Sequence, residues 1–314
     1  MRIAIAGSGA MGCRFGAALA EAGHEVLLFD GWAEHVAAIN DFGLRVTDER
    51  GTRAIPVRAA PFPAPEDPAD LVIVFTKATM TASVAASCTG AIGPSTLVLT
   101  LQNGLGNIEA LLPYVPRERL LAGTTTLGTE LVGPGHIRAL GTGETVLGAL
   151  TPGPADPERI VGLLASSTIS ARVEDDVLAV IWAKVAFNCV MNALAAIASV
   201  PVSALALCPE FDSLAGTILD EVAAVAAAEG VRVDVDAALA LMKAQFDPAA
   251  SGSHLASTLQ DLLAGRPTEI AHLNGAVASR ASAHGLAAPA NALITQLVKL
   301  LEATHSRRVT SVHS

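Results

Sequence analysis

The sequence predicts an α/β protein whose N-terminal domain contains a doubly wound parallel sheet and whose C-terminal domain is all α-helical. Short apolar runs alternate with helical patterns over residues 1–110. The runs at 71–76 and 95–101 are apolar almost throughout, as in strands covered by helices on both faces. Strand signals almost vanish beyond residue 176. Because single cores divide beyond about 250 to 300 residues, a chain of 314 residues suits two domains, which we place at 1–173 and 174–314.

The other elements of the first domain are bounded by glycine, proline or polar residues. They are a strand at 2–7, a helix at 9–23, a strand at 25–30, a hairpin at 44–57 turning near Gly51, a hairpin at 136–150 turning at 141–143, and a strand at 169–174 that follows one more helix. In the second domain, Asp175 and Asp176 can cap the first helix. Helices there are expected to break at Pro201, Gly230, Gly265, Gly275 and Gly285.

Composition excludes several classes of function. The chain is 51% hydrophobic and 16% charged, which favours large cores and a lean surface compatible with a homodimer. A formal net charge of -10 and a pI near 5.2 provide no basic surface for nucleic acid or an anionic membrane, so we expect neither partner. No C-x-x-C pair and no signal peptide is recognisable, so we expect a cytoplasmic location with reduced thiols at Cys13, Cys88, Cys189 and Cys208.

The segment GSGAMG predicts a dinucleotide-binding turn that consists of Gly7, Ser8, Gly9, Ala10, Met11 and Gly12. Gly7 permits the tight turn, Gly9 lets the backbone approach a pyrophosphate, and Gly12 lets the helix pack on the strand. The start of the helix then offers amide groups to the phosphates. The alternative is a glycine-rich turn without a ligand. The preceding strand, the following helix and a later acidic residue favour nucleotide binding.

That acidic residue is Asp30, at the end of the second strand. Its carboxylate can accept hydrogen bonds from both ribose hydroxyls of NADH, whereas a 2′-phosphate would meet like charge. No arginine follows at 31–33 to bind such a phosphate, so we expect NADH to be favoured over NADPH. Asp30 as the N-cap of the next helix is the compatible alternative. Lys77, after the strand at 71–76, could place a positive charge near the adenosine end of the cofactor.

A polar stripe interrupts the apolar helical run AVIWAKVAFNCVMNAL. Lys184, Asn188 and Asn192 stand at i, i+4 and i+8, which places them along one side of an α-helix. They also argue against a membrane span and for a buried helix of a soluble protein. Burying a charge or an amide without partners costs several kcal/mol, so we expect the three groups to line a cavity that provides partners. A polar seam satisfied by neighbouring helices is the alternative.

A lysine in such surroundings suits the reduction of a ketone. Partial desolvation lowers its pKa toward neutrality, where transfer of a proton to the developing alkoxide is efficient. The asparagines could hold oxygens of the substrate. We therefore expect a carbonyl reductase with Lys184 as proton donor. The histidines show no H-E-x-x-H motif or clustered spacing, so no metal site is expected.

Two further segments carry polar residues. LQNG places Asn103 after a strand of the parallel sheet, at the edge where such sheets bind ligands, although Asn-Gly also caps turns. In STLQDLLAGRPTEIAHLNG, Ser257 and Asp261 share one helix and Glu269 is expected in the next. A solvated helix face is the alternative for Glu269, and spacing alone leaves both open.

These segments together resemble the ketopantoate reductase (2-dehydropantoate 2-reductase) family. The resemblance runs over almost the whole chain, through GSGAMG, FTKA, LQNG, GPGHIRALGTGETVLG, KVAFNCVMN, STLQDLLAGRPTEIAHLNG and AHGLAAPAN. It implies an N-terminal Rossmann-type domain and a helical domain like that of 6-phosphogluconate dehydrogenase, with the site in the cleft between them. It also implies reduction of 2-dehydropantoate to (R)-pantoate in pantothenate and coenzyme A biosynthesis with NAD(P)H.

The resemblance assigns roles to individual residues. Lys184 would be the general acid that protonates the C2 oxygen, and Glu269 would hold the substrate near that lysine. The substrate's hydroxyl end would be bound by Asn188 and Asn192, and its carboxylate by Ser257. Asn103 would lie between the nicotinamide and the substrate and so contact both.

Two positions depart from many members of the family. A basic residue often stands where this chain has Asp30 and Gly31, so the resemblance does not by itself imply NADPH. Others have a histidine where this chain has Leu127, so we expect the wall near the substrate to differ. A dehydrogenase for another small 2-oxo acid, or a nucleotide-sensing protein without turnover, are therefore alternative functions. The sensor is disfavoured because it needs neither Lys184 nor Glu269.

Overall fold

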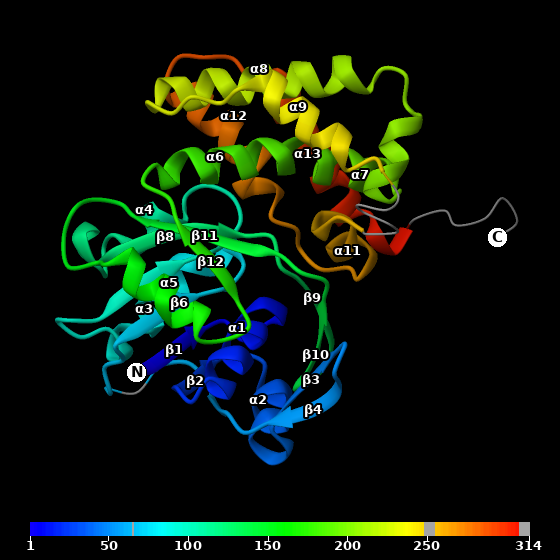
Figure 1. Cartoon of the computed structure of the whole chain (residues 1–314). Helices are drawn as coiled ribbons and strands as arrows, with labels where there is room; N and C mark the ends of the chain where they lie inside the picture. The colour runs from blue at the N-terminus through cyan, green and yellow to red at the C-terminus, as the bar shows by residue number, and fades with distance from the viewer. Residues whose placement is uncertain (65, 248–254, 308–314) are drawn as a thin grey trace, which may run out of the picture. The chain divides into compact units, whose positions relative to one another are not determined.

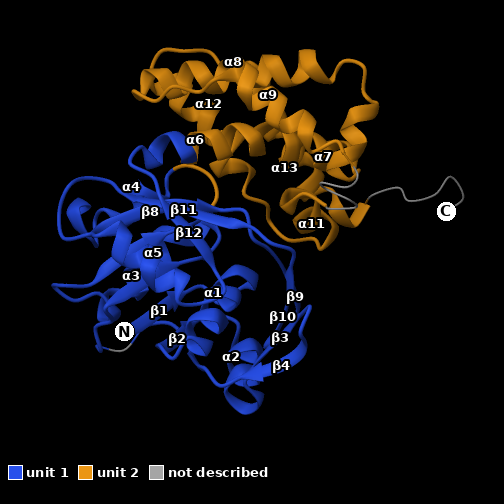
Figure 2. Ribbon diagram, in the orientation of Figure 1, with its two compact units in different colours: residues 1–102, 106–180 blue, residues 103–105, 181–314 orange. Residues whose placement is uncertain are grey.

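The structure, a computed structural model, describes residues 1–64, 66–247 and 255–307 (Figure 1). Contacts divide the chain into two compact units, shown in Figure 2: residues 1–102 with 106–180, and residues 103–105 with 181–314. The short segment 103–105 therefore belongs to the second unit. The domain boundary at 173/174 stays a prediction, since a group of contacts is not evidence that a segment folds alone.

The first unit is built on a sheet of eight strands: β1 (Arg2–Ala6), β2 (Glu25–Phe29), β5 (Arg58–Ala60), β6 (Leu71–Val74), β7 (Leu97–Thr100), β8 (Leu120–Thr125), β11 (Glu144–Ala149) and β12 (Ser170–Val173). Their order is β12-β11-β8-β7-β6-β1-β2-β5. All neighbouring pairs are parallel except β8 with β11. The carboxyl ends of β1, β2, β6 and β7 therefore lie at one edge of the sheet.

Helices cover both faces of this sheet, which confirms the predicted α/β fold class with a doubly wound sheet. They are α1 (Ala10–Glu21), α2 (Ala33–Phe42), α3 (Thr81–Ser87), α4 (Asn107–Leu111) and α5 (Pro157–Ala165), with 3₁₀ turns at Ala78–Met80, Thr89–Ala91 and Arg117–Arg119. Successive residues of β1 point to opposite faces. Ile3 and Ile5 pack with α1, and Ala4 and Ala6 belong to a second core beside α3.

A smaller sheet corrects one predicted hairpin. Its order is β4-β3-β10-β9, from β3 (Leu44–Asp48), β4 (Gly51–Ile55), β9 (Gly128–Gly133) and β10 (His136–Leu140). The hairpin of β3 and β4 was predicted correctly, with Gly51 as the first residue of β4. The hairpin predicted at 136–150 is wrong, because β10 pairs with β9 and β3, whereas β11 lies in the large sheet. The tight turn of this region is the one between β9 and β10, and it contains Gly135, whose φ of 63° suits glycine. Residues 141–143 connect β10 of the smaller sheet to β11 of the larger one.

Within its described residues, the second unit contains helices and no strand, as predicted. They are α6 (Val177–Phe187, whose first turn belongs to the first unit), the π-helical turn η4 (Asn188–Asn192), α7 (Ala193–Ala198), α8 (Phe211–Ala228), α9 (Val235–Ala244), α11 (Ser257–Leu263), α12 (Asn274–Ala283) and α13 (Pro289–Ala303), with 3₁₀ turns at Val202–Leu207, η6 (Ile270–His272) and His305–Arg307. Asp176 caps the first helix through the amide of Ala179, as predicted. The break predicted at Gly275 lies at Leu273, between η6 and α12, and Gly275 is the second residue of α12.

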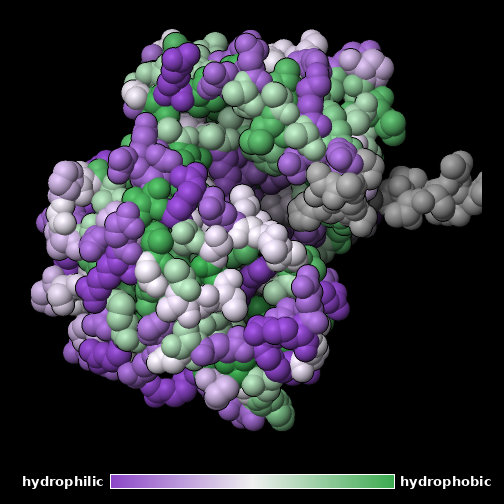
Figure 3. All heavy atoms as spheres, in the orientation of Figure 1, coloured by the Kyte–Doolittle hydropathy of each residue, from purple (hydrophilic) through white to green (hydrophobic). Residues whose placement is uncertain are grey.

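The helical run Val177–Ala198 is long and apolar enough to span a membrane, judged by length and composition alone. Half of its most apolar window is buried inside the protein. On the face drawn in Figure 3, hydrophilic side chains are intermixed with smaller hydrophobic areas. The absence of a membrane partner remains a prediction from composition.

Candidate active site

The glycine-rich turn contains three glycines that are needed for different reasons. Gly7 has φ +95°, and a Cβ there would lie 2.6 Å from the backbone nitrogen of Thr76. A Cβ on Gly12 would lie 2.0 Å from the carbonyl oxygen of Gly7. Gly9 differs, because a Cβ there would meet no atom within 4 Å. The protein itself therefore leaves room above Gly9, which fits the close approach of a pyrophosphate.

The start of α1 is suited to an anion. Its N-cap, Gly9, makes no side-chain capping bond, and the first turn contains no acidic residue. By contrast, Asp156 and Asp234 cap α5 and α9 by accepting hydrogen bonds from backbone amides. Ala10, Met11 and Gly12 thus present a helix N-terminus with its dipole and amide groups uncovered by a carboxylate, which fits the phosphates of a dinucleotide.

Asp30 is tied to the glycine-rich turn. Its Oδ2 accepts hydrogen bonds from the backbone amide (2.9 Å) and the hydroxyl (3.3 Å) of Ser8, and its Oδ1 accepts from the amide of Trp32 (2.9 Å). The N-cap of α2 is Trp32, so the alternative of Asp30 as cap is not realised. Asp30 is only partly buried. A carboxylate has about four acceptor positions, so Asp30 keeps about one, on Oδ1, for a ribose hydroxyl.

A buried pair behind the turn was not recognised from the sequence. The thiol of Cys13 donates to the carbonyl oxygen of Ser8 (2.9 Å), and its sulfur lies 3.4 Å from Nε2 of His35. Nδ1 of His35 accepts from the amide of Gly135 (3.0 Å), which assigns the ring proton to Nε2. His35 is buried rather than a surface residue, and burial lowers its pKa. The pair connects the turn to the β9–β10 hairpin.

The polar side chains that follow β6 and β7 make different contacts. Lys77 is exposed at the N-cap of the 3₁₀ turn after β6. Gln102 donates from Nε2 to the carbonyl oxygen of Thr76 (2.7 Å) and to the hydroxyl of Thr81 (2.8 Å), so it braces two segments of the first unit. The adjacent Asn103 is grouped with the second unit, where the amide of Leu105 donates to the carbonyl of His272 (2.8 Å).

Three predicted site residues meet in the second unit. Nδ2 of Asn103 donates to Oε2 of Glu269 at 3.4 Å, and Glu269 is buried. The Glu269 carboxylate also acts electrostatically on Lys184. Burial lowers the pKa of Lys184 to about 8, while the charge of Glu269 opposes part of that shift. Glu269 is the N-cap of the 3₁₀ turn η6, not part of the α-helix expected there.

The two asparagines of the polar stripe lie in the π-helical turn η4, at its first and last residues. A regular α-helix was expected, and the wider π turn changes the direction of each side chain after residue 187. Asn188 is buried, and Nδ2 of Asn192 donates to the hydroxyl of Ser257 at 3.2 Å. The structure therefore brings Asn192 and Ser257 together. Isolated π turns occur frequently at functional sites.

Neighbouring residues hold the Ser257 helix and the Glu269 segment. Asp261 shares α11 with Ser257, as predicted. It is buried, and its carboxylate binds the guanidinium of Arg266 at 3.1 Å. The amide of Thr268 donates to Glu302 at 2.7 Å. Leu127, by contrast, packs into the core of the first unit.

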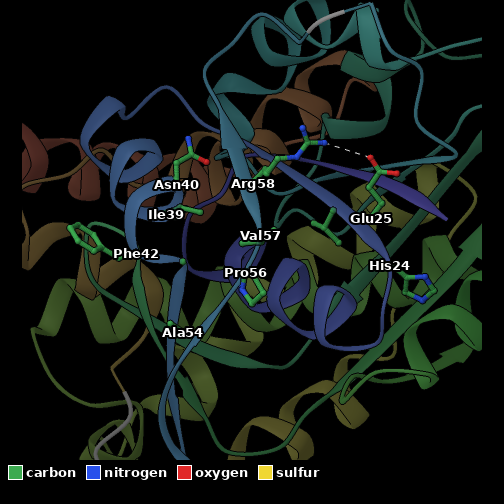
Figure 4. A pocket seen from close by; sticks show the side chains of 11 residues that line it. His24, Glu25, Ile39, Asn40, Phe42, Ala54, Pro56, Val57 and Arg58 are labelled. Carbon is green, nitrogen blue, oxygen red and sulfur yellow. Dashed lines mark ion pairs between the residues drawn. The ribbon is translucent and has the colours of Figure 1, made fainter.

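One cavity of about 530 Å³ lies in the first unit, between the start of β2, the end of α2 and the segment 54–58 (Figure 4). None of the predicted site residues lines it. His24 and Glu25 place it at the amino ends of the parallel strands, opposite the edge where open α/β sheets bind nucleotides. Over the described residues, no group of three or more His, Cys, Asp or Glu side chains could hold a metal ion.

Replacing single glycines should separate folding from ligand binding. Gly9→Ala is expected to leave the melting temperature unchanged within about 2 °C but to weaken NADH binding about 10-fold or more, because the new methyl group occupies the open space above the turn. Gly12→Ala should lower both the melting temperature and the affinity for NADH, because its Cβ would meet a backbone oxygen. Thermal unfolding and a fluorescence titration measure the two effects. Unchanged NADH affinity in Gly9→Ala would remove the case for a ligand at this turn.

Family models match both parts of the chain. One, described as ketopantoate reductase PanE/ApbA, covers residues 3–152, and its C-terminal counterpart covers 176–302. The chain is 34% identical to a 2-dehydropantoate 2-reductase of Lactococcus lactis over 95% of its length and 97% of the relative's. It is 36% identical to one of Halobacterium salinarum over 96% and 99%.

Solved structures agree with this relationship. A D-mandelate dehydrogenase with NADH and anilino(oxo)acetate matches with a TM-score of 0.94 and 34% identity, over 98% of this chain and 100% of the other. A PanE/ApbA family ketopantoate reductase from Ralstonia eutropha matches with a TM-score of 0.88 and 36% identity, over 98% and 100%. With its glycine-rich turn and its Lys184, Glu269 and Asn103 group in place, the chain belongs to the ketopantoate reductase family.

Proposed function

We propose that this protein reduces 2-dehydropantoate to (R)-pantoate with NADH, and that Lys184 is the general acid. As a member of its family the protein is an NAD(P)-dependent oxidoreductase. The observation that carries the finer proposal is Lys184, whose pKa is lowered to about 8 by burial beside the Glu269 carboxylate. An ammonium group with that pKa is protonated at neutral pH and still transfers its proton readily.

The residues of the proposed reaction come from both units. When bound at the glycine-rich turn, a reduced nicotinamide would supply the hydride for C2 of the 2-oxo acid. In the second unit, Lys184 donates a proton from Nζ to the C2 oxygen, so hydride plus proton convert the ketone to an alcohol. Glu269 keeps Lys184 protonated and accepts a hydrogen bond from the substrate, while Asn103 holds the Glu269 carboxylate in place. Ser257, Asn188 and Asn192 supply hydroxyl and amide groups for the substrate's carboxylate and hydroxyl.

The preference for NADH rests on Asp30. Its carboxylate is held in place by Ser8 and Trp32, so it cannot easily turn away from a 2′-phosphate. No basic residue occupies 31–33. The similar D-mandelate dehydrogenase was solved with NADH, which supports the same choice here. Lys77 would contribute positive charge to the adenosine end.

A second candidate substrate is another small 2-oxo acid. The similarity to a D-mandelate dehydrogenase bound to anilino(oxo)acetate favours an acid with a bulkier or aromatic side chain. The same Lys184, Glu269 and asparagine groups would serve that reaction. A place in coenzyme A biosynthesis follows only from the first candidate. The cytoplasmic location and the homodimer stay predictions from the sequence.

A panel of 2-oxo acids tests the substrate. With NADH in excess, kcat/KM is expected to be highest for 2-dehydropantoate, ahead of phenylglyoxylate and 2-oxoisocaproate. Lys184→Ala should lower kcat/KM by on the order of 10²- to 10⁴-fold, the usual contribution of a general acid, with NADH affinity unchanged. A better aromatic substrate would support the second candidate. NADH oxidation unaffected by Lys184→Ala would contradict the assignment of the acid.

The pH dependence of kcat/KM for reduction should report the ionisation of Lys184. Only the protonated amine donates, so activity is lost as pH rises through its pKa of about 8 and falls about 10-fold per pH unit above it. Glu269→Gln removes a negative charge that raises this pKa, so the break should move to lower pH. Initial rates between pH 6 and 10 measure both. A break that stays in place or moves upward in Glu269→Gln would contradict the coupling.

Asp30→Asn tests the choice of cofactor while keeping the side chain's shape and an acceptor for Ser8. The ratio of kcat/KM with NADH to that with NADPH is expected to fall by about 10-fold or more, because the repulsion of the 2′-phosphate disappears. Steady-state rates with each cofactor give the ratio. Wild-type protein that uses NADPH as well as NADH would show the proposal for Asp30 to be wrong.

A further inference from the structure

We propose that Asn274 is a positioning residue that holds the π-helical turn η4 and thereby aims Asn188 and Asn192 at the substrate. The inference rests on the proposed function, since it assigns these asparagines to substrate binding. Asn274 makes its contacts through side-chain atoms inside the second unit and is itself fully buried. It therefore acts through the turn, without touching the substrate.

The first step is the contact with the turn. A π turn replaces the i→i+4 bonds of the α-helix by i→i+5 bonds, so carbonyl groups near it lose their regular geometry. The carbonyl oxygen of Cys189, inside the turn, accepts a hydrogen bond from Nδ2 of Asn274 at 3.0 Å. A side chain of another helix thus supplies a donor at the point where the helix departs from α geometry.

Glu221 and Asn291 fix the orientation of the Asn274 side-chain amide. Glu221 of α8 accepts hydrogen bonds from the amides of Ala290 and Asn291 and from Nδ2 of Asn291, at 2.8–2.9 Å. Because this carboxylate acts as an acceptor, Asn291 presents its Nδ2 to Glu221 and its Oδ1 to Asn274. Nδ2 of Asn274 donates to that oxygen at 2.9 Å, and therefore also faces Cys189.

Burying the side chain of Asn274 has a cost in free energy, which its hydrogen bonds must offset. Among the described residues, Oδ1 of Asn274 is one of the buried atoms without a hydrogen-bond partner, and an apolar side chain would avoid that cost. The two donated bonds must outweigh it.

Asn274 also begins α12, a few residues after Glu269, so the same segment carries the Glu269 carboxylate and the group that holds η4. Figure 2 shows α8, α12 and α13 in the orange of the second unit.

Asn274→Leu, of similar size but without a donor, tests the proposal. The KM for the 2-oxo acid is expected to rise about 10-fold to 100-fold, the scale of a substrate displaced by about 1 Å, with the Kd of NADH unchanged within about 2-fold. When Asn188→Ala and Asn192→Ala are both already present, Asn274→Leu should add little, because the side chains that it positions are gone. Unchanged KM, or effects that multiply fully, would overturn the proposal.

Two further variants guard against a simple loss of folding. Thr295→Val is the matched control. Thr295 is buried in α13, and among the described residues its hydroxyl bonds only the carbonyl of Asn291, so the KM of this variant should equal that of the wild type. Glu221→Gln can donate as well as accept, so it relaxes the orientation of both asparagines and should raise KM in the same direction by a smaller factor. If Asn274→Leu does not fold, an unchanged KM in Glu221→Gln overturns the proposal.

Amide hydrogen exchange separates this inference from the proposed function. Peptides that cover residues 187–193 should exchange faster in Asn274→Leu than in Thr295→Val. Wild-type protein that reduces no 2-oxo acid would overturn the proposed function alone, because the exchange measurement still reports whether Asn274 holds η4. Unaltered exchange in the folded variant would overturn the inference even if the enzyme is active.

Discussion

In the proposed mechanism, the balance of forces on the ammonium group of Lys184 determines the activity of the second unit. Burial disfavours the charge of Lys184, and the buried Glu269 carboxylate restores part of it, so the pKa comes to about 8. Either force alone would give a poorer acid: a solvated lysine holds its proton too tightly at neutral pH, and an isolated buried one loses it. The contact between Asn103 and Glu269 adds a hydrogen bond to the same group.

The first unit solves a different problem, which is to expose backbone groups without weakening the fold. Gly7 and Gly12 are required by contacts inside the protein, whereas Gly9 leaves open space. Around them, the Asp30 carboxylate holds the amide of Ser8, and the Cys13 thiol holds its carbonyl. The turn is therefore fixed from both sides before any ligand binds, which reduces the entropy cost of binding.

Both units place functional groups on backbone that departs from regular structure and support that backbone with buried polar side chains. His35 joins the glycine-rich turn to Gly135, and Asn274 joins the π turn to Asn291 and Glu221. Buried polar networks of this kind specify one arrangement, because a shifted arrangement would leave several donors without acceptors. For the same reason, a single substitution in either network should lower the stability of the protein.

The sequence by itself determined the α/β class, the glycine-rich turn after β1 and the all-helical second part, and it predicted Lys184 and the asparagines as site residues, whereas Glu269 was chosen only through the family resemblance. These features depend on local periodicity, on short motifs and on residue chemistry, which are readable along the chain. The tertiary structure alone decided that β10 pairs with β9 and not β11, that Asp30 binds Ser8, that Asn103 joins the second unit, and that η4 is a π turn. The Asp30–Ser8 bond, the grouping of Asn103 and the pairing of β10 with β3 depend on contacts between residues far apart in sequence, whose energies a local pattern does not contain.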